Sequence, residues 1–213
     1  LFPKSFEDPY QHFAAIQTCC HNTPYESFET FLPEDESMRK LCIQSMRKNE
    51  IKLHYNAPGI FQIDGEFNPC SENPEYRKNA LNLAKKHIYY AAEAESPIIV
   101  FAACPDKGIK KRPELLKRFM EYFLELAELC RTYHMEITIE PIERHRFKKL
   151  ILGPFKDCAD FMLEAQKNGA ANAHLMIDTA HLPLMEESLE TAIKETQRAG
   201  LIHVHLGDAV LDP

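Results

Sequence analysis

The sequence predicts an α/β fold, and its residues favour a closed (β/α)₈ TIM barrel. Short β-rich runs alternate with longer helical segments, the chain has only seven glycines, and polar residues gather at the carboxyl ends of the expected strands. Strands and helices that alternate at this spacing indicate βαβ units and a parallel sheet. An open doubly wound sheet is the competing architecture, but it often carries a glycine-rich phosphate loop, and this sequence has no such loop.

Six runs have the length and composition of strands, and six segments have helical periodicity. The expected strands are 25–31, 51–57, 97–103, 135–141, 173–179 and 201–207. The expected helices are 9–20, 35–49, 74–95, 112–133, 156–168 and 188–199.

The helix boundaries carry their own chemical signals. Pro74 and Pro113 stand where the first turn of a helix tolerates proline. Asp35 and Ser188 are candidate N-caps, because their side chains can accept hydrogen bonds from free backbone amides. Gly200 is a candidate helix stop. These signals support the division into elements.

The composition is that of a globular protein with a substantial core. The chain is 45% hydrophobic and 27% charged, and no linker divides residues 1–213, so we expect a single domain. The net charge of −7 argues against nucleic acid or an anionic membrane as a partner. No apolar run approaches the roughly 20 residues of a membrane span.

The seven cysteines predict a reducing compartment and hence a cytoplasmic location. Their number is odd, and no pair has the two-residue gap of a zinc knuckle or redox motif. Cys42, Cys130 and Cys158 lie in helix-like stretches, where a free cysteine behaves as a small apolar residue. We expect no disulfide framework.

The expected strands have one aliphatic face, suited to packing against helices, and one polar face. In a barrel the polar face points to the axis. Glu140, Asp178 and His205 stand on that face at the carboxyl ends of three strands, where barrel enzymes place their chemistry. Two carboxylates and an imidazole that converge on one axis form a site for a divalent cation.

Each polar residue also has a simpler interpretation. Asp178 by itself is equally suited to capping the next helix. His203 is more easily a satisfied core histidine than a ligand, Glu143 a solvated loop acid, and Glu136 a residue at the opposite rim of its strand. Three strand ends in matching register, with complementary ligand types, favour the metal site.

Three segments, 137–144, 174–182 and 201–210, resemble the xylose isomerase-like TIM barrels. The resemblance is strongest to the sugar-phosphate isomerase/epimerase group, which includes ketose 3-epimerases and hydroxypyruvate isomerases. The stretch around Glu29 resembles the second strand of that fold. The order of elements matches from the first helix to the seventh strand, so the resemblance covers nearly the whole chain.

The resemblance implies one divalent metal ion (Mn, Mg, Co or Zn). Its ligands in the family are a Glu on strand five, an Asp on strand six, a His on strand seven and a Glu on strand eight. Glu140, Asp178 and His205 match the first three, and the fourth is expected beyond Pro213. Strand one is absent or reduced to residues 1–6, so we expect the barrel to be truncated at both ends.

The implied activity is isomerisation or epimerisation of a ketose, a sugar phosphate or a small hydroxy-carbonyl compound. In such enzymes the metal stabilises an enediolate, while a carboxylate removes the proton next to the carbonyl. Glu140 is expected to be both metal ligand and base, and His181 to hydrogen-bond a substrate oxygen. The partner glutamate is expected on the eighth strand.

Two departures leave the substrate open. The family often continues its fifth strand as Glu-x-x-Asn-Arg, whereas this chain keeps Arg144, a candidate substrate contact, but has Glu143 in the Asn position. After the strand-seven histidine, epimerases supply an arginine that this chain lacks. His54 and Glu29 are further candidates for contacting substrate.

Three other functions remain open. An endonuclease IV-like DNA repair enzyme would need further histidines, including one at the end of strand four, where Ala103 and Cys104 stand. A lyase or dehydratase of inositol-type substrates would use the same metal site. A non-catalytic barrel could serve as a binding module. A homo-oligomer is compatible with all of these.

Overall fold

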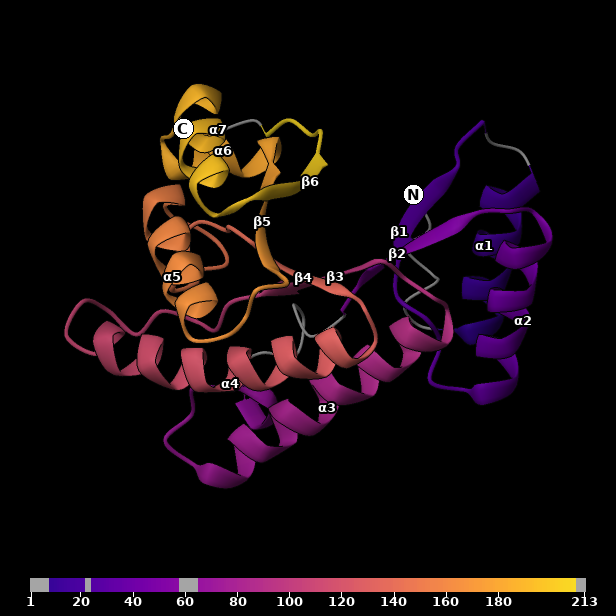
Figure 1. Cartoon of the computed structure of the whole chain (residues 1–213), viewed down its shortest axis with the longest axis horizontal. Helices are drawn as coiled ribbons and strands as arrows, with labels where there is room; N and C mark the ends of the chain where they lie inside the picture. Colours follow the sequence, from indigo (N-terminus) through magenta and orange to yellow (C-terminus); the bar gives the residue numbers. More distant parts are fainter. Residues whose placement is uncertain (1–7, 22–23, 58–64, 210–213) are drawn as a thin grey trace.

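Six parallel strands form one curved sheet with helices packed around it (Figure 1). The computed structural model describes residues 8–21, 24–57 and 65–209. The strand order is β1-β2-β3-β4-β5-β6, so each strand pairs with its neighbours in the sequence. The architecture is an open half-barrel of the α/β class, as predicted for an incomplete (β/α)₈ barrel. Residues 1–6, where a reduced first strand was expected, lie outside the described residues.

The strands fall within the predicted runs and correspond to strands two to seven of the expected barrel. They are β1 (Ser27–Thr30), β2 (Lys52–Asn56), β3 (Ile98–Ala102), β4 (Glu136–Glu140), β5 (Ala173–Asp178) and β6 (Leu201–His205).

The helices also follow the prediction, with short additions in the connections. The longer ones are α1 (Pro9–His21), α2 (Glu36–Lys48), α3 (Pro74–Glu93), α4 (Arg112–Thr132), α5 (Phe155–Lys167) and α7 (Leu189–Ala199). The short ones are η3 (Gly65–Phe67), η4 (Thr179–His181) and α6 (Leu182–Met185). The predicted caps are confirmed: the Asp35 side chain accepts from the Met38 amide, and Ser188 accepts from the Thr191 amide.

The main core lies between the sheet and the helices. Tyr55 on β2 and Phe119 and Phe123 on α4 are almost completely buried. The ring of Phe161 on α5 lies 5.5 Å from that of Phe119, and this contact joins two neighbouring helices. Burial of these aromatic groups, together with the aliphatic side chains around them, stabilises the packing of the helices on the sheet. As predicted, Cys42, Cys130 and Cys158 are buried among apolar side chains.

The prediction for the aliphatic face is wrong on β6. Ile202 and Val204 are 38% and 45% exposed, although their alternation suggested packing against a helix. The physical reason is the place of β6 at the edge of the sheet. No helix among the described residues follows this strand to cover its outer face.

None of the helices in the described part of the chain combines the length and apolar character needed to cross a membrane.

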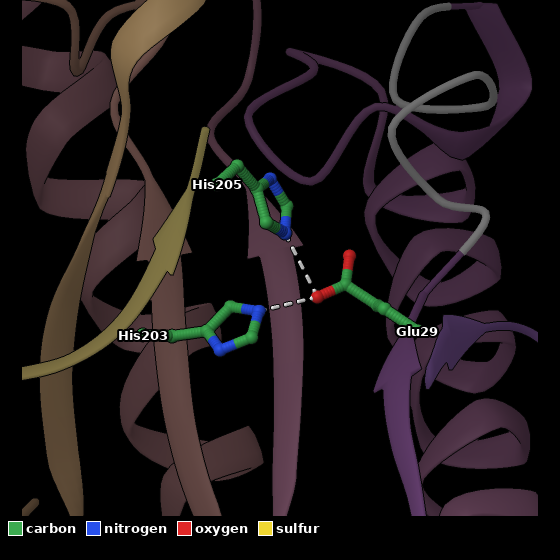
Figure 2. Close-up of side chains that lie close together, drawn as sticks. All are labelled: Glu29, His203 and His205. Atoms are coloured by element: carbon green, nitrogen blue, oxygen red, sulfur yellow. Dashed lines mark hydrogen bonds and ion pairs between the residues drawn. The ribbon is translucent and has the colours of Figure 1, made fainter. Parts of the chain in front are cut away.

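Parallel pairing brings the carboxyl ends of the strands to one rim. Asp178 on β5 is in register with His205 on β6, and Ala102 on β3 is in register with Glu140 on β4. The sheet also curls. Glu29 on β1, at one edge, reaches the histidines of β6 at the other edge (Figure 2). The polar strand ends therefore face a common interior.

Candidate functional site

Glu140, Asp178 and His181 form a cluster at the carboxyl rim. Nε2 of His181 lies 3.3 Å from Oε1 of Glu140 and 3.9 Å from Oδ2 of Asp178. One ligand atom from each of the three residues lies within 4.8 Å of those of the other two. Glu140 is only 6% exposed. A carboxylate buried to this extent requires a positive partner, because removing its charge from water is costly.

The two ring nitrogens of His205 face different groups: Nδ1 faces the carboxylates of the rim cluster and Nε2 faces Glu29. Its Nδ1 lies 3.6 Å from Oδ2 of Asp178 and 3.9 Å from Oε1 of Glu140. Its Nε2 lies 2.9 Å from Oε2 of Glu29 (Figure 2). The three metal ligands predicted from the sequence therefore point toward one another, and His181 stands beside them.

Glu29 is the centre of a second cluster. Its Oε2 atom accepts hydrogen bonds from Nε2 of His203, at 2.6 Å, and of His205. Its Oε1 atom accepts a hydrogen bond of 2.6 Å from the Asn56 side chain. One ligand atom from each of Glu29, His203 and His205 lies within 4.8 Å of the others. This cluster has the donor types of a metal site, but every Glu29 oxygen already has a partner.

Asp178 caps the next helical turn and also faces the histidines of the site. Its Oδ1 atom accepts a 2.8 Å hydrogen bond from the Ala180 amide and so caps η4. Its Oδ2 atom faces the two histidines. A carboxylate has two oxygens with separate lone pairs, so capping leaves the second oxygen available as a ligand.

The interpretation of Glu143 as a solvated loop acid is wrong. Glu143 is only 1% exposed. Its Oε1 atom accepts hydrogen bonds from the backbone amides of Phe147 and Lys148, and its Oε2 atom lies 3.4 Å from Nδ1 of His181. The loop after β4 folds back over this side chain and buries it against the site.

The charges of the two clusters are tightly coupled. Burial would raise the pKa of Glu29, but hydrogen bonds from His203 and His205 outweigh it and lower the pKa to about 2. Contacts with Asp178 and then with Glu29 raise the pKa of His205 to about 10. Burial opposes both remaining shifts: Glu140 still raises the pKa of His181, and His205 still lowers that of Asp178. Without a metal, the protonated His205 ring offsets part of the negative charge of the carboxylates.

A divalent cation fits this donor set. Two carboxylates and an imidazole are ligands that zinc and manganese accept. A cation among them would supply the positive charge that imidazolium protons otherwise provide. The buried position of Glu140, with imidazole nitrogens of His181 and His205 at 3.3 and 3.9 Å, is the structural observation that supports the fit.

Arg144 and His54, the remaining predicted substrate contacts, have partners outside the rim cluster. The Arg144 guanidinium donates to the Ile151 carbonyl and to Asp157, each at 2.6 Å. Its substrate contact stays a prediction. The His54 ring lies 5.3 Å from the His203 ring, and burial, then the charge of His203, lowers its pKa.

Sequence reasoning missed two residues of the site. Glu143 is the first: it stands in the Asn position of the family motif, but the sequence predicts a solvated side chain because loop acids are usually exposed to water. Asn56 is the second, and the sequence predicts no role for it, although it lies on the polar face of its strand. Its position at the carboxyl end of β2, two residues beyond His54, which pairs with Glu29, was the available signal.

The chain matches a known protein family over most of its length. The model of the family described as xylose isomerase-like TIM barrel matches residues 13–213. No curated protein matches the chain.

Several solved structures share the fold. A D-psicose 3-epimerase with D-tagatose from Clostridium cellulolyticum H10 has a TM-score of 0.75 and 19% identity, with 92% of this chain and 67% of the epimerase covered. A 3-keto-D-glucoside 4-epimerase from E. coli has a TM-score of 0.70 and 15% identity, with 97% and 79% covered. An AP endonuclease, family 2, from Brucella melitensis has a TM-score of 0.75 and 13% identity, with 94% and 78% covered. The chain thus spans about two thirds of the psicose epimerase.

Proposed function

The chain belongs to the xylose isomerase-like TIM barrel family, and from this premise we propose that it is a divalent-metal-dependent isomerase or epimerase. Its substrate class is a ketose, a sugar phosphate or a small hydroxy-carbonyl compound. The observation that carries the proposal is the meeting of Glu140, Asp178 and His205, from three successive strands, with Nδ1 of His205 within 3.9 Å of both carboxylates.

Glu140, Asp178 and His205 would hold the cation. When bound, it supplies Lewis-acid polarisation of a carbonyl and stabilises the negative charge that develops on proton removal. His181 lies close enough to the same carboxylates to form an alternative third ligand. Cation titrations of His205→Asn and His181→Asn distinguish the two sets, because only the ligand's loss abolishes tight binding.

Side chains of the protein itself, Glu140 and His181, would carry out the proton transfer. Glu140 is buried, so its carboxylate is poorly solvated and suited to accept a proton from the carbon next to a carbonyl. His181 directs Nε2 toward Glu140 Oε1, and a substrate oxygen beside this pair would receive its hydrogen bond. Glu143 contacts Nδ1 of His181 from the other side of the ring.

The structural neighbours support a sugar-like substrate. The solved relatives include epimerases whose descriptions name D-psicose, D-tagatose and a 3-keto-D-glucoside. Ketose substrates present a carbonyl beside a hydroxyl, and the proposed site has two carboxylates and two histidines to address these groups. At sequence identities of 19% and 15%, the similarity supports a shared fold but does not identify the particular sugar, which the experiment below tests.

DNA repair is a second candidate because an AP endonuclease shares the fold. A DNA repair endonuclease that uses three zinc ions would need a histidine ligand at the end of β3. Ala103 and Cys104 stand there, and both are fully buried. The net charge of −7 also disfavours a DNA partner. A lyase of inositol-type substrates would share the metal site and the first proton removal.

Hydrogen exchange tests the proposed reaction directly. The protein is loaded with Mn²⁺ in D₂O and offered a panel of ketoses, sugar phosphates and hydroxypyruvate, and deuterium incorporation is followed by NMR. We expect incorporation next to the carbonyl of at least one substrate, reduced about 10²–10⁴-fold by Glu140→Gln. Glu136→Gln, at the opposite end of β4, is the matched control. Cation binding without exchange in any compound would contradict isomerisation, and cleavage of abasic DNA would establish the endonuclease instead.

A further inference from the structure

We infer that Glu29 is a positioning residue, which fixes the His205 ring so that Nδ1 faces the cation site. The inference rests on the proposed function and adds a residue to it. Glu29 lies on β1 and His205 on β6, at opposite edges of the sheet, yet Oε2 of Glu29 accepts a 2.9 Å hydrogen bond from Nε2 of His205 (Figure 2).

A histidine ligand needs a partner for its second nitrogen. A metal-bound imidazole is neutral and coordinates through one nitrogen, while the other keeps its proton and donates it to a carboxylate, a carbonyl or water. Glu29 accepts at Nε2. The proton is therefore fixed on Nε2, and the lone pair is left on Nδ1, which faces Asp178 at 3.6 Å and Glu140 at 3.9 Å.

Glu29 is itself held in place. Asn56 on the neighbouring strand donates to its Oε1 atom at 2.6 Å, and His203 donates to its Oε2 atom at 2.6 Å. The Glu29 side chain is 17% exposed. With both oxygens bonded, the carboxylate cannot rotate freely, so it presents a fixed acceptor to the His205 ring. The contact also links the two edges of the open sheet at the level of the site.

A second cation at Glu29, His203 and His205 is the competing use of the same residues. Their ligand atoms are close enough for it. However, His205 can bind two metals only if it loses both ring protons, and imidazole holds the second proton strongly. The two possibilities differ in the number of cations bound, which a titration counts.

Cation affinity without any substrate provides the test. Mn²⁺ is titrated into the full chain and into Glu29→Leu and Glu29→Gln by calorimetry. We expect one cation per chain and an affinity about 10–100-fold lower in Glu29→Leu, the usual effect of losing such a partner. Glu29→Gln keeps an oxygen that can accept the Nε2 proton of His205, so its Mn²⁺ affinity should fall less than that of Glu29→Leu. Glu136→Leu is the matched control, because it removes an equivalent carboxylate 2.9 Å from His174 Nε2, away from the site.

A second measurement keeps the inference testable if Glu29→Leu does not fold. In the Zn²⁺-loaded wild type, nitrogen-15 NMR of the histidines should show metal on Nδ1 of His205 and a proton on Nε2. Metal on Nε2, two cations per chain, or unchanged affinity in Glu29→Leu would overturn the role of Glu29. Failure of the wild type to bind any divalent cation would instead overturn the proposed function.

Discussion

At the scale of single residues, the site joins buried carboxylates to imidazoles that compensate them. Glu143 illustrates how closely these groups are held. Its two oxygens serve different purposes: Oε1 satisfies the backbone amides of Phe147 and Lys148, while Oε2 lies 3.4 Å from His181. Stability of the loop and orientation of the histidine therefore depend on one side chain.

Replacing Glu143 should destabilise the protein as well as the site. Glu143→Ala leaves two amides without their acceptor, and we expect a loss of about 1–3 kcal/mol in the free energy of unfolding. Urea denaturation in the presence of a chelator measures it without a metal contribution. Glu121→Ala, at an exposed position on α4, should change stability by less than about 0.5 kcal/mol. Equal effects of the two substitutions would show that Glu143 does not hold the loop.

His87 should make stability dependent on pH. It is 3% exposed, and burial, with the nearby Lys86 charge, lowers its pKa from 6.5 to about 4. The Leu32 amide donates to the Tyr55 hydroxyl, which leaves the hydroxyl proton free to be donated to Nδ1 of His87. Since the unfolded chain binds the proton first, this contribution is fully present above pH 6.5 and is lost as the pH falls toward 4.

The contribution of His87 to the free energy of unfolding can be measured by urea denaturation at two pH values. Between pH 7 and pH 5, we expect His87 to account for about 2 kcal/mol of lost stability in the wild type. His87→Gln has no titrating ring and should lose correspondingly less over the same interval. Identical losses in both proteins would mean that His87 is not held neutral by the fold.

Sequence reasoning was most successful for residues whose position follows from strand alternation. Glu140, Asp178 and His205 lie near the carboxyl ends of predicted strands on the polar face, so the sequence alone predicted that they would lie close together, and their role as metal ligands stays a prediction. Glu143 could not be placed in this way, because its burial depends on how the loop after β4 folds back over it.

At the scale of elements, the helix and strand ends follow local chemistry. Asp35 and Ser188 cap α2 and α7 as predicted. Gly200 ends α7 with a φ of +87°, a conformation that side-chain-bearing residues rarely adopt, and β6 begins at the next residue. The exposure of Ile202 and Val204 was not predictable, because alternation indicates which residues share a face but not what covers it.

Gly200→Ala should be more disruptive than the same change at Gly169. Both glycines have a positive φ, so both substitutions introduce backbone strain. At Gly200 the new Cβ would also lie 2.5 Å from Nδ1 of His174, whereas nothing lies within 4 Å at Gly169. We expect Gly200→Ala to lower stability by about 1–3 kcal/mol, and Gly169→Ala by less. Equal losses by thermal unfolding would exclude the contact with His174 as a cause.

At the scale of the whole molecule, the curvature of the sheet creates the site. The alternation of strands and helices predicted the parallel sheet, and the sequential strand order is the one expected of the barrel rather than of the doubly wound alternative. It could not predict the hydrogen bonds between Glu29 and the β6 histidines, which join residues more than 170 positions apart. Those contacts depend on how far the sheet curls, which is set by packing along its full width.

The central claim is that Glu140, Asp178 and His205 hold one divalent cation, and Mn²⁺ titration of the wild type and Asp178→Asn tests it most directly. The asparagine keeps an oxygen for the Ala180 amide, so the cap of η4 survives while the charged ligand is lost. The account predicts one tightly bound Mn²⁺ in the wild type and loss of that binding in Asp178→Asn, with the fold unchanged by circular dichroism. Unaltered Mn²⁺ binding in the folded variant, or none in the wild type, would contradict it.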